Sequence, residues 1–195
     1  RDVAELQRLL GPADPHARIS ATPGTDTHIP IWLLGSSLFS AQLAAMKGLP
    51  YAFASHFAPR FLHQAIALYR QLFRPSATLA KPYVMVGVPV VAAPTDEEAE
   101  FLATSTQQRV LGILTGQRGQ LPAPVANFMQ QLGPREQAAI NDFLAMSVVG
   151  GPETVRAGFA RIQESTEADE LILVTDVYNP MLRLTSLEIA AQALK

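Results

Sequence analysis

The segment PIWLLGSSLFSAQLAAMKGLP, residues 30–50, determines the fold that we expect for this chain. It opens with a short apolar run between Pro30 and Gly35, which is too short for a helix and apolar on both faces. That pattern is typical of a strand in a parallel sheet that helices cover on both sides. After a turn at residues 35–37, apolar residues recur on one face of a helix that Gly48 ends; they are Leu38, Ala41, Ala45 and Met46.

The turn between this strand and this helix is rich in hydroxyl groups. It consists of Gly35, Ser36 and Ser37, and Ser40 lies one helical turn further on. The first backbone N–H groups of a helix have no partner within it, and the helix dipole is positive at that end, so such a turn can hold an anion. Serine is also a common helix N-cap. The residues therefore leave two interpretations open, a plain cap and a phosphate site.

The remaining chain, interpreted as a single domain over residues 1–195, repeats the order of strand and helix. Further strands are expected to begin near Tyr51, Val84 and Leu171. This alternation predicts a parallel sheet with right-handed crossovers, either a small open α/β domain or half of an eight-stranded barrel. The other expected elements are helices over 1–10, 59–73, 95–116, 135–146, 151 onward and 180–194, a short strand around 17–21, and a Gly- and Pro-rich insertion loop over 116–134.

Three candidate sites follow the carboxyl ends of the expected strands, where parallel barrels carry their functional residues. They are the serine turn, Ser55-His56 and Thr175-Asp176. Histidine titrates near neutrality, so His56 could transfer a proton if it faces a cavity, or it could be a hydrogen-bonded residue of the rim. We interpret Thr175 and Asp176 as a cap at the end of their strand.

The composition excludes several classes of function. With 48% hydrophobic and 16% charged residues, the chain is expected to be a well-buried globular protein. A net charge of -2 gives no reason to expect nucleic acid or an anionic membrane as a partner. The absence of cysteine excludes thiolate metal sites and fits a reducing compartment, so we expect a cytoplasmic protein. His16 and His28 lie in a polar loop and are expected to be solvated, which leaves no metal site.

Four segments resemble the bacterial luciferase-like flavin-dependent monooxygenases, in the same order as in that family. They are WLLGSSLFSAQLAAMKGLPYAFASHFAP (32–59), KPYVMVGVPVVAAPTDEEAE (81–100), SVVGGPETVRAGF (147–159) and ADELILVTDVY (168–178). The resemblance covers roughly residues 26–195. It implies the second half of a TIM-type (β/α)8 barrel.

The resemblance also implies an activity and a cofactor. The intact family reacts reduced flavin with oxygen to give a peroxyflavin, which oxidises an aldehyde, alkane, sulfonate or similar small molecule. By resemblance the cofactor is reduced FMN, or a deazaflavin in its place, with the phosphate held at Gly35, Ser36, Ser37 and Ser40. A flavin reductase would supply the FMNH2. Catalytic residues beyond the candidate His56 are not identified, because in the family they come largely from the first half of the barrel.

Two alternatives remain beside the enzyme. The chain could be a non-catalytic flavin- or phosphate-binding protein, or an interaction protein built on the same half-fold. It begins with Arg1 and resembles half of a barrel, so we expect a partial chain. Half a barrel leaves two strand edges unpaired and an apolar inner face exposed. We therefore expect association with a second copy, as in a dimer, or with the missing N-terminal half.

Overall fold

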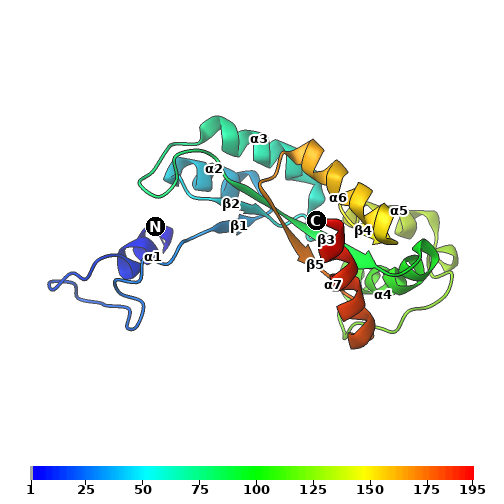
Figure 1. Cartoon of the computed structure of the whole chain (residues 1–195). Coiled ribbons are helices and arrows are strands. Elements are labelled where there is room, and N and C mark those ends of the chain that lie inside the picture. The colour runs from blue at the N-terminus through cyan, green and yellow to red at the C-terminus, as the bar shows by residue number, and fades with distance from the viewer. Residues whose placement is uncertain (1) are drawn as a thin grey trace.

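The structure is a computed structural model that describes residues 2–195, and it is built on a parallel sheet (Figure 1). Four strands lie side by side in the order β1 (Leu33–Gly35), β2 (Tyr51–Phe53), β3 (Val84–Ala92) and β5 (Glu170–Val174). Every pairing among them is parallel. The prediction of four adjacent parallel strands at these places is confirmed.

The long strand β3 organises the sheet. Its first half pairs with β2, where Tyr51 lies opposite Val84, and with β5, where Glu170 lies opposite Met85. Its last three residues pair with a fifth strand, β4 (Val148–Gly150). β4 is not among the strands predicted from the sequence, because its three residues are too few to show a periodicity.

One face of the sheet is packed against helices. Alternate residues of β3 point into this core and are almost fully buried: Val84, Val86, Val88 and Val90. Figure 1 shows α2 (Leu38–Lys47), α3 (Leu62–Leu72) and α6 (Pro152–Thr166) on this side, and α7 (Pro180–Ala193) adds Ala190 to the same cluster. Burying a valine-sized side chain stabilises a fold by roughly 1.5–3 kcal/mol, so this face supplies the main cohesion of the sheet.

The opposite face of the sheet is open over β1 and β5, whereas Val91 at the end of β3 is buried there in a second cluster with Ala99 and Leu102. Leu34 on β1 is 63% exposed and Ile172 on β5 is 48% exposed, whereas their neighbours Leu33 and Leu173 pack against the core. Within residues 2–195, β1, β4 and β5 each pair with one neighbour only. A parallel sheet with unpaired edges and a partly open apolar inner face is the arrangement of half a barrel.

The helix ends follow the predicted chemistry. Gly48 ends α2 in the left-handed conformation, with φ 60° and ψ 37°. Thr95 caps α4 (Asp96–Leu114), because its Oγ1 accepts a 3.2 Å hydrogen bond from the Glu98 N–H, which is one half of the expected capping box. Asn179 caps α7 through bonds from the Met181 and Leu182 N–H groups.

Two expected elements differ in the structure. The short strand around residues 17–21 is absent; the backbone there forms local turns, with the Ala17 N–H bonded to the Asp14 carbonyl. The helix expected over 59–73 begins as a 3-10 turn, η1 (Pro59–Phe61), and continues as α3 (Leu62–Leu72).

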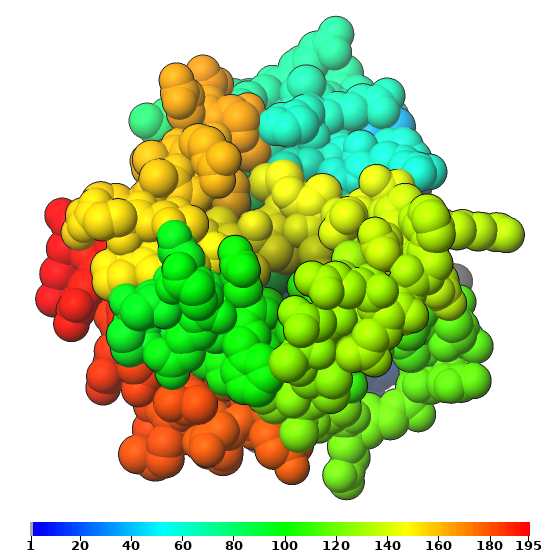
Figure 2. Space-filling model, turned by 90° about the vertical axis from the view of Figure 1, so that its right-hand side faces the viewer, coloured from blue at the N-terminus to red at the C-terminus, as the bar shows by residue number. Residues whose placement is uncertain are grey.

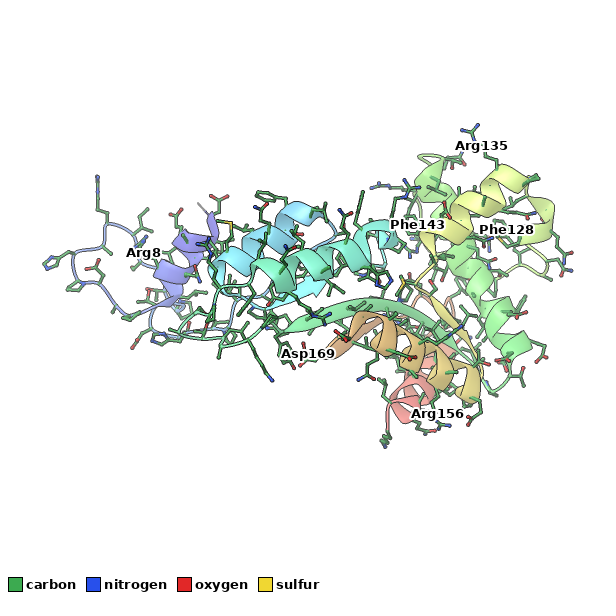
Figure 3. The ribbon with its side chains drawn as sticks, turned by 90° about the horizontal axis from the view of Figure 1, so that it is seen from above. Arg8, Phe128, Arg135, Phe143, Arg156 and Asp169 are labelled. Atoms are coloured by element: carbon green, nitrogen blue, oxygen red, sulfur yellow. The ribbon has the colours of Figure 1, made fainter. Side chains whose placement is uncertain are left out.

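The two ends of the molecule carry the remaining elements. Figure 3 shows α1 (Asp2–Leu10), with Arg8, at one end. At the other end lie Phe128 of the expected insertion loop and Arg135 of α5 (Pro134–Phe143). The insertion loop contains one short 3-10 turn, η2 (Met129–Gln131).

Candidate functional site

The serine turn is a complete helix cap. Ser37 has extended backbone angles, and its Oγ accepts a 3.2 Å hydrogen bond from the Ser40 N–H. In return, Ser40 Oγ accepts a 3.4 Å bond from the Ser37 N–H, and it donates a 2.8 Å bond to the Ser37 carbonyl. The capping interpretation is thus confirmed for Ser37 and Ser40. A cap of this kind fixes the geometry of the first turn of α2. It leaves the other backbone N–H groups of that turn without a partner.

The free donors at this turn lie next to the cap. The N–H groups of Leu38 and Phe39 have no partner within the part of the chain that the structure describes, as is usual for the first turn of a helix. The Ser36 hydroxyl likewise makes no side-chain hydrogen bond among residues 2–195. These three groups, at the positive end of the α2 dipole, suit an anion.

Gly35 and Tyr51 support the turn from beneath. A β-carbon on Gly35 would lie 2.6 Å from Ser40 Cβ, so only glycine fits against the capping serine. The Tyr51 hydroxyl is 3.2 Å from Ser40 Oγ and donates a 3.4 Å bond to the Ser37 carbonyl. Burial raises the pKa of Tyr51, and the hydrogen bond with Ser40 opposes that rise. Tyr51 is therefore a neutral hydrogen-bonding support for the turn.

His56 lies beside the serine turn, at the next strand end. The Ala54 N–H donates to the Gly35 carbonyl at 3.0 Å, which holds the two strand ends together. The ring of His56 lies against Phe57, with centroids 4.3 Å apart, and its Nδ1 is buried without a partner among the described residues. Burial lowers the pKa of His56; Asp176 raises that pKa and Arg109 lowers it, both with smaller effect. The imidazole is accordingly biased towards its neutral form.

Asp176 belongs to an ion pair that the sequence did not reveal. Arg109 Nη2 on α4 is 2.5 Å from Asp176 Oδ2, and each side chain is about one-third exposed. Thr106, one helical turn before Arg109, donates a 3.2 Å bond to the Asp176 carbonyl. Arg109 sits in the run TSTQQR, where one cation has no signal of its own, so sequence reasoning missed it. The interpretation of Asp176 as a cap is wrong, because it pairs with Arg109 across two elements.

Thr175 has a structural role. Its hydroxyl is buried 3.4 Å from Ser186 Oγ, and Ser186 accepts a 2.8 Å bond from the Ala92 N–H. This contact fastens α7 to the end of β3. Of the residue pair Thr175-Asp176, only Asp176 is near the candidate site.

A cavity of about 490 Å³ lies against Phe57, the residue after His56. It is lined by Phe57, by α4 and by residues 117–122 of the insertion loop, and Phe143 at the end of α5 completes the wall (Figure 3). Two arginines, Arg109 and Arg118, also line it. Gln108, Gln117 and Gln120 line it as well, so polar side chains share the wall with the apolar Phe57, Ile113 and Phe143.

Other kinds of site find no support among residues 2–195. No group of three or more His, Cys, Asp or Glu side chains is arranged to hold a metal there. His16 and His28 are exposed, as expected. No helix of the described chain has the length and apolarity that crossing a bilayer requires.

Comparison with known proteins agrees with this architecture. Residues 8–168 match the family of luciferase-like monooxygenases. The chain is 48% identical over 190 residues to the luciferase-like monooxygenase of Escherichia coli K12, covering 97% of this chain and 57% of that protein. It is 44% identical to the uncharacterized protein YvbT of Bacillus subtilis, covering 98% and 57%.

A solved structure shows the same fold. The crystal structure of apo-MsnO8 superimposes with a TM-score of 0.84 at 30% identity, over 98% of this chain and 58% of that one. The chain thus spans a little more than half the length of the proteins that it matches, in agreement with a half-barrel. On the matched residues and the shared fold, the chain belongs to the luciferase-like monooxygenase family.

Proposed function

We propose that this chain forms the cofactor-phosphate site and one wall of the substrate cavity in a reduced-flavin-dependent monooxygenase. The observation that carries the proposal is the serine turn, which presents free N–H groups at the carboxyl edge of a luciferase-like sheet, beside His56. The reaction class is the oxidation of a small organic substrate with molecular oxygen.

The free donors of the turn fit a phosphate. The N–H groups of Leu38 and Phe39 and the Ser36 hydroxyl are the donors open to an anion, while Ser37 and Ser40 hold the turn in shape. Gly35 keeps Ser40 close to the strand. This division changes the roles expected of the four residues, since Ser37 and Ser40 act through the geometry of the cap.

The remaining residues supply the surroundings of the reaction. When bound, the flavin supplies the oxygen chemistry, and the protein orients the reactants and excludes water. Phe57, Ile113 and Phe143 form an apolar wall suited to the substrate. His56, held neutral by its burial, is the group placed to accept or return a proton at this edge.

Either FMN or a deazaflavin suits the turn, because both carry a phosphate on the ribityl chain. Two proteins of the same fold illustrate the choice: the oxygenating component of 3,6-diketocamphane monooxygenase was solved in complex with FMN (18% identity, TM-score 0.57), and a secondary alcohol dehydrogenase is F420-dependent (13% identity, TM-score 0.59). These likenesses extend to the fold alone. We propose FMN, delivered in its reduced form by a flavin reductase in the cytoplasm.

The proposal is tested by comparing FMN with riboflavin, which differs only in lacking the phosphate. Each is titrated into the protein, oxidised in air and reduced under anaerobic conditions, with flavin fluorescence or absorbance as the readout. We expect FMN to bind at least about tenfold more tightly than riboflavin, a difference of about 1.4 kcal/mol. Equal affinities for FMN and riboflavin would show that the protein does not recognise the phosphate, and the proposal would be wrong.

A non-catalytic role remains the second candidate, because two edges of the sheet and its inner face lack a partner among residues 2–195. Reductase-dependent oxygen consumption that requires an added substrate separates the two candidates. A protein that binds FMN but shows no such consumption, alone or with its other half-barrel, is a flavin-binding protein.

A further inference from the structure

A second, smaller cavity lies at the carboxyl end of the sheet, against α4 and α5. Its volume is about 170 Å³, and its walls are mainly apolar, with Val91, Val149, Val174 and Leu144 among them. It shares no lining residue with the cavity beside Phe57. Figure 2 faces this end of the molecule, where the start of α4 (green) and the segment of α5 (yellow-green) lie side by side.

Two polar side chains of this cavity lack the hydrogen bonds that they need. Gln107 on α4 and Ser147 before β4 both line it. Gln107 Oε1 and Ser147 Oγ are each buried, and neither has a hydrogen-bond partner within residues 2–195. Buried polar groups in folded proteins are nearly always paired, with protein, water or ligand. Both atoms belong to residues that line this cavity, so an occupant within reach of both would supply the missing bonds.

The chemistry of these two groups selects a neutral occupant. The glutamine amide and the serine hydroxyl can each donate and accept. Asp176 also lines the cavity, but its carboxylate is already paired with Arg109, so the walls offer no unpaired charge. A charged ligand would lose its hydration without an opposite charge in return. A hydroxyl or a primary amide, which donates and accepts at one end, fits instead.

The size of the cavity limits the occupant. A volume of about 170 Å³ is that of about five or six water molecules at roughly 30 Å³ each. It therefore admits a ligand, or the end of a larger one, of about six non-hydrogen atoms. The valine and leucine walls suit a short aliphatic chain.

We propose that this cavity binds a short aliphatic molecule, or the end of a longer substrate, through a neutral hydroxyl or primary amide that bonds to Gln107 and Ser147. The site goes beyond the flavin-dependent activity proposed above. It requires no cofactor, so its test is independent of that activity.

The test uses butyramide as the probe, titrated into the flavin-free chain. Methyl NMR signals of Val91, Val149 and Val174 report binding, because these side chains line the cavity. We expect saturable shifts at these methyls with butyramide. Butyrate, which only accepts, and butylammonium, which only donates, are similar in size and are expected to bind at least about tenfold more weakly.

Four variants locate the binding. Ser147→Ala and Gln107→Leu each remove one polar partner and should weaken butyramide about tenfold. Ala103→Leu fills the cavity while keeping both polar groups, and it should abolish the shifts. Ser105→Ala is the matched control, because Ser105 Oγ is also buried without a partner on α4 but does not line this cavity. It should leave the affinity unchanged, and melting curves establish that each variant is folded.

Three outcomes would overturn the proposal. Absence of saturable shifts in the wild type would mean that water alone occupies the cavity. Equal affinity for butyramide in the wild type and in folded Ser147→Ala and Gln107→Leu would place the probe elsewhere. The same loss of affinity in Ser105→Ala as in Gln107→Leu would mean that any substitution on α4 weakens the probe.

Discussion

A β-carbon at Gly87 would lie 2.7 Å from Nδ1 of His56, so β3 makes room for the imidazole by carrying no side chain at that position. The backbone of Gly87 also accepts the hydrogen bond from Ser55 Oγ. The strand that forms the core on one face thereby positions the candidate proton-transfer residue on the other. This relationship joins sheet packing to the site.

Gly87→Ala should be destabilising because of His56. The added methyl must displace the imidazole, and overpacking of this kind costs roughly 1–3 kcal/mol. In a His56→Ala background the same change should cost much less, since the clashing ring is absent. Urea unfolding of the four proteins of this cycle gives the coupling. Equal costs in both backgrounds would show that the methyl collides with something other than the ring.

The charges around His56 should shift its pKa in opposite directions. Asp176→Asn removes a carboxylate that raises the pKa of His56, so that pKa should fall further. Arg109→Gln removes a cation that lowers the pKa of His56, so that pKa should rise. Titration of the imidazole signals by NMR measures both changes, and exposed His63 on α3 serves as the reference signal. Shifts of the same sign in the two variants would contradict this electrostatic arrangement.

The lowered pKa of His56 predicts how stability depends on pH. In the unfolded chain the imidazole has its ordinary pKa of 6.5, and in the folded chain that pKa is lower. Between the two values the unfolded state binds more protons, so the free energy of unfolding rises with pH. This contribution is complete above about pH 6.5 and is lost as the pH falls towards the folded pKa. His56→Gln does not titrate, so its unfolding free energy should depend less on pH across that window; identical pH dependence in the two proteins would count against the shift.

The sequence predicted the strands that carry strong apolar runs. The run from Val84 to Ala92 is rich in valine and nearly all apolar, which favours a buried strand. Gly48 and Asn179 mark helix ends by well-defined backbone and capping chemistry. β4 was missed because it depends on pairing with the end of β3, a contact distant in sequence. The strand expected around 17–21 did not form; the segment ARISA has a single β-branched residue, Ile19.

The candidate site was predicted in part, for the same reason. The serine turn is local, so residues 35–40 were sufficient to propose it. The Arg109–Asp176 pair joins positions 67 residues apart. The need for glycine at position 87 becomes visible only when His56 is seen to pack against it. Such relationships arise from packing, which one sequence does not display. The roles of Ser37 and Ser40 likewise became clear only from their hydrogen bonds.

The isolated chain should associate through its open edges. Leu34 and Ile172 are exposed on the inner face, and β1 and β5 each lack a second neighbour among the described residues. Unpaired strand edges recruit other strands. We expect a complex that buries well over ~1,000 Å², with a second copy or with the N-terminal half of the barrel. Light scattering measures the mass, and Leu34→Lys should weaken self-association; a wild-type monomer stable at micromolar concentration would contradict the expectation.

The last prediction separates the two roles of the serine turn. Ser37→Asp keeps an oxygen that can accept from the Ser40 N–H, but it adds a negative charge beside the phosphate. It should therefore weaken FMN strongly while leaving the melting temperature nearly unchanged. Ser37→Ala removes the capping oxygen, which should cost about 1 kcal/mol of stability, but it removes no donor to the phosphate and should weaken FMN only slightly.

Comparing FMN affinity and stability between Ser37→Asp and Ser37→Ala decides between a cap alone and a cap with a phosphate site. If the turn only caps α2, the aspartate variant is unchanged in both measurements and the alanine variant is the damaged one. If the turn also holds a phosphate, the aspartate variant loses more FMN affinity and the alanine variant loses more stability. Riboflavin is the matched ligand, because it has no phosphate for the introduced carboxylate to repel and should bind equally to wild type and Ser37→Asp. FMN affinity that is the same in wild type and Ser37→Asp would leave Ser37 as a helix cap alone.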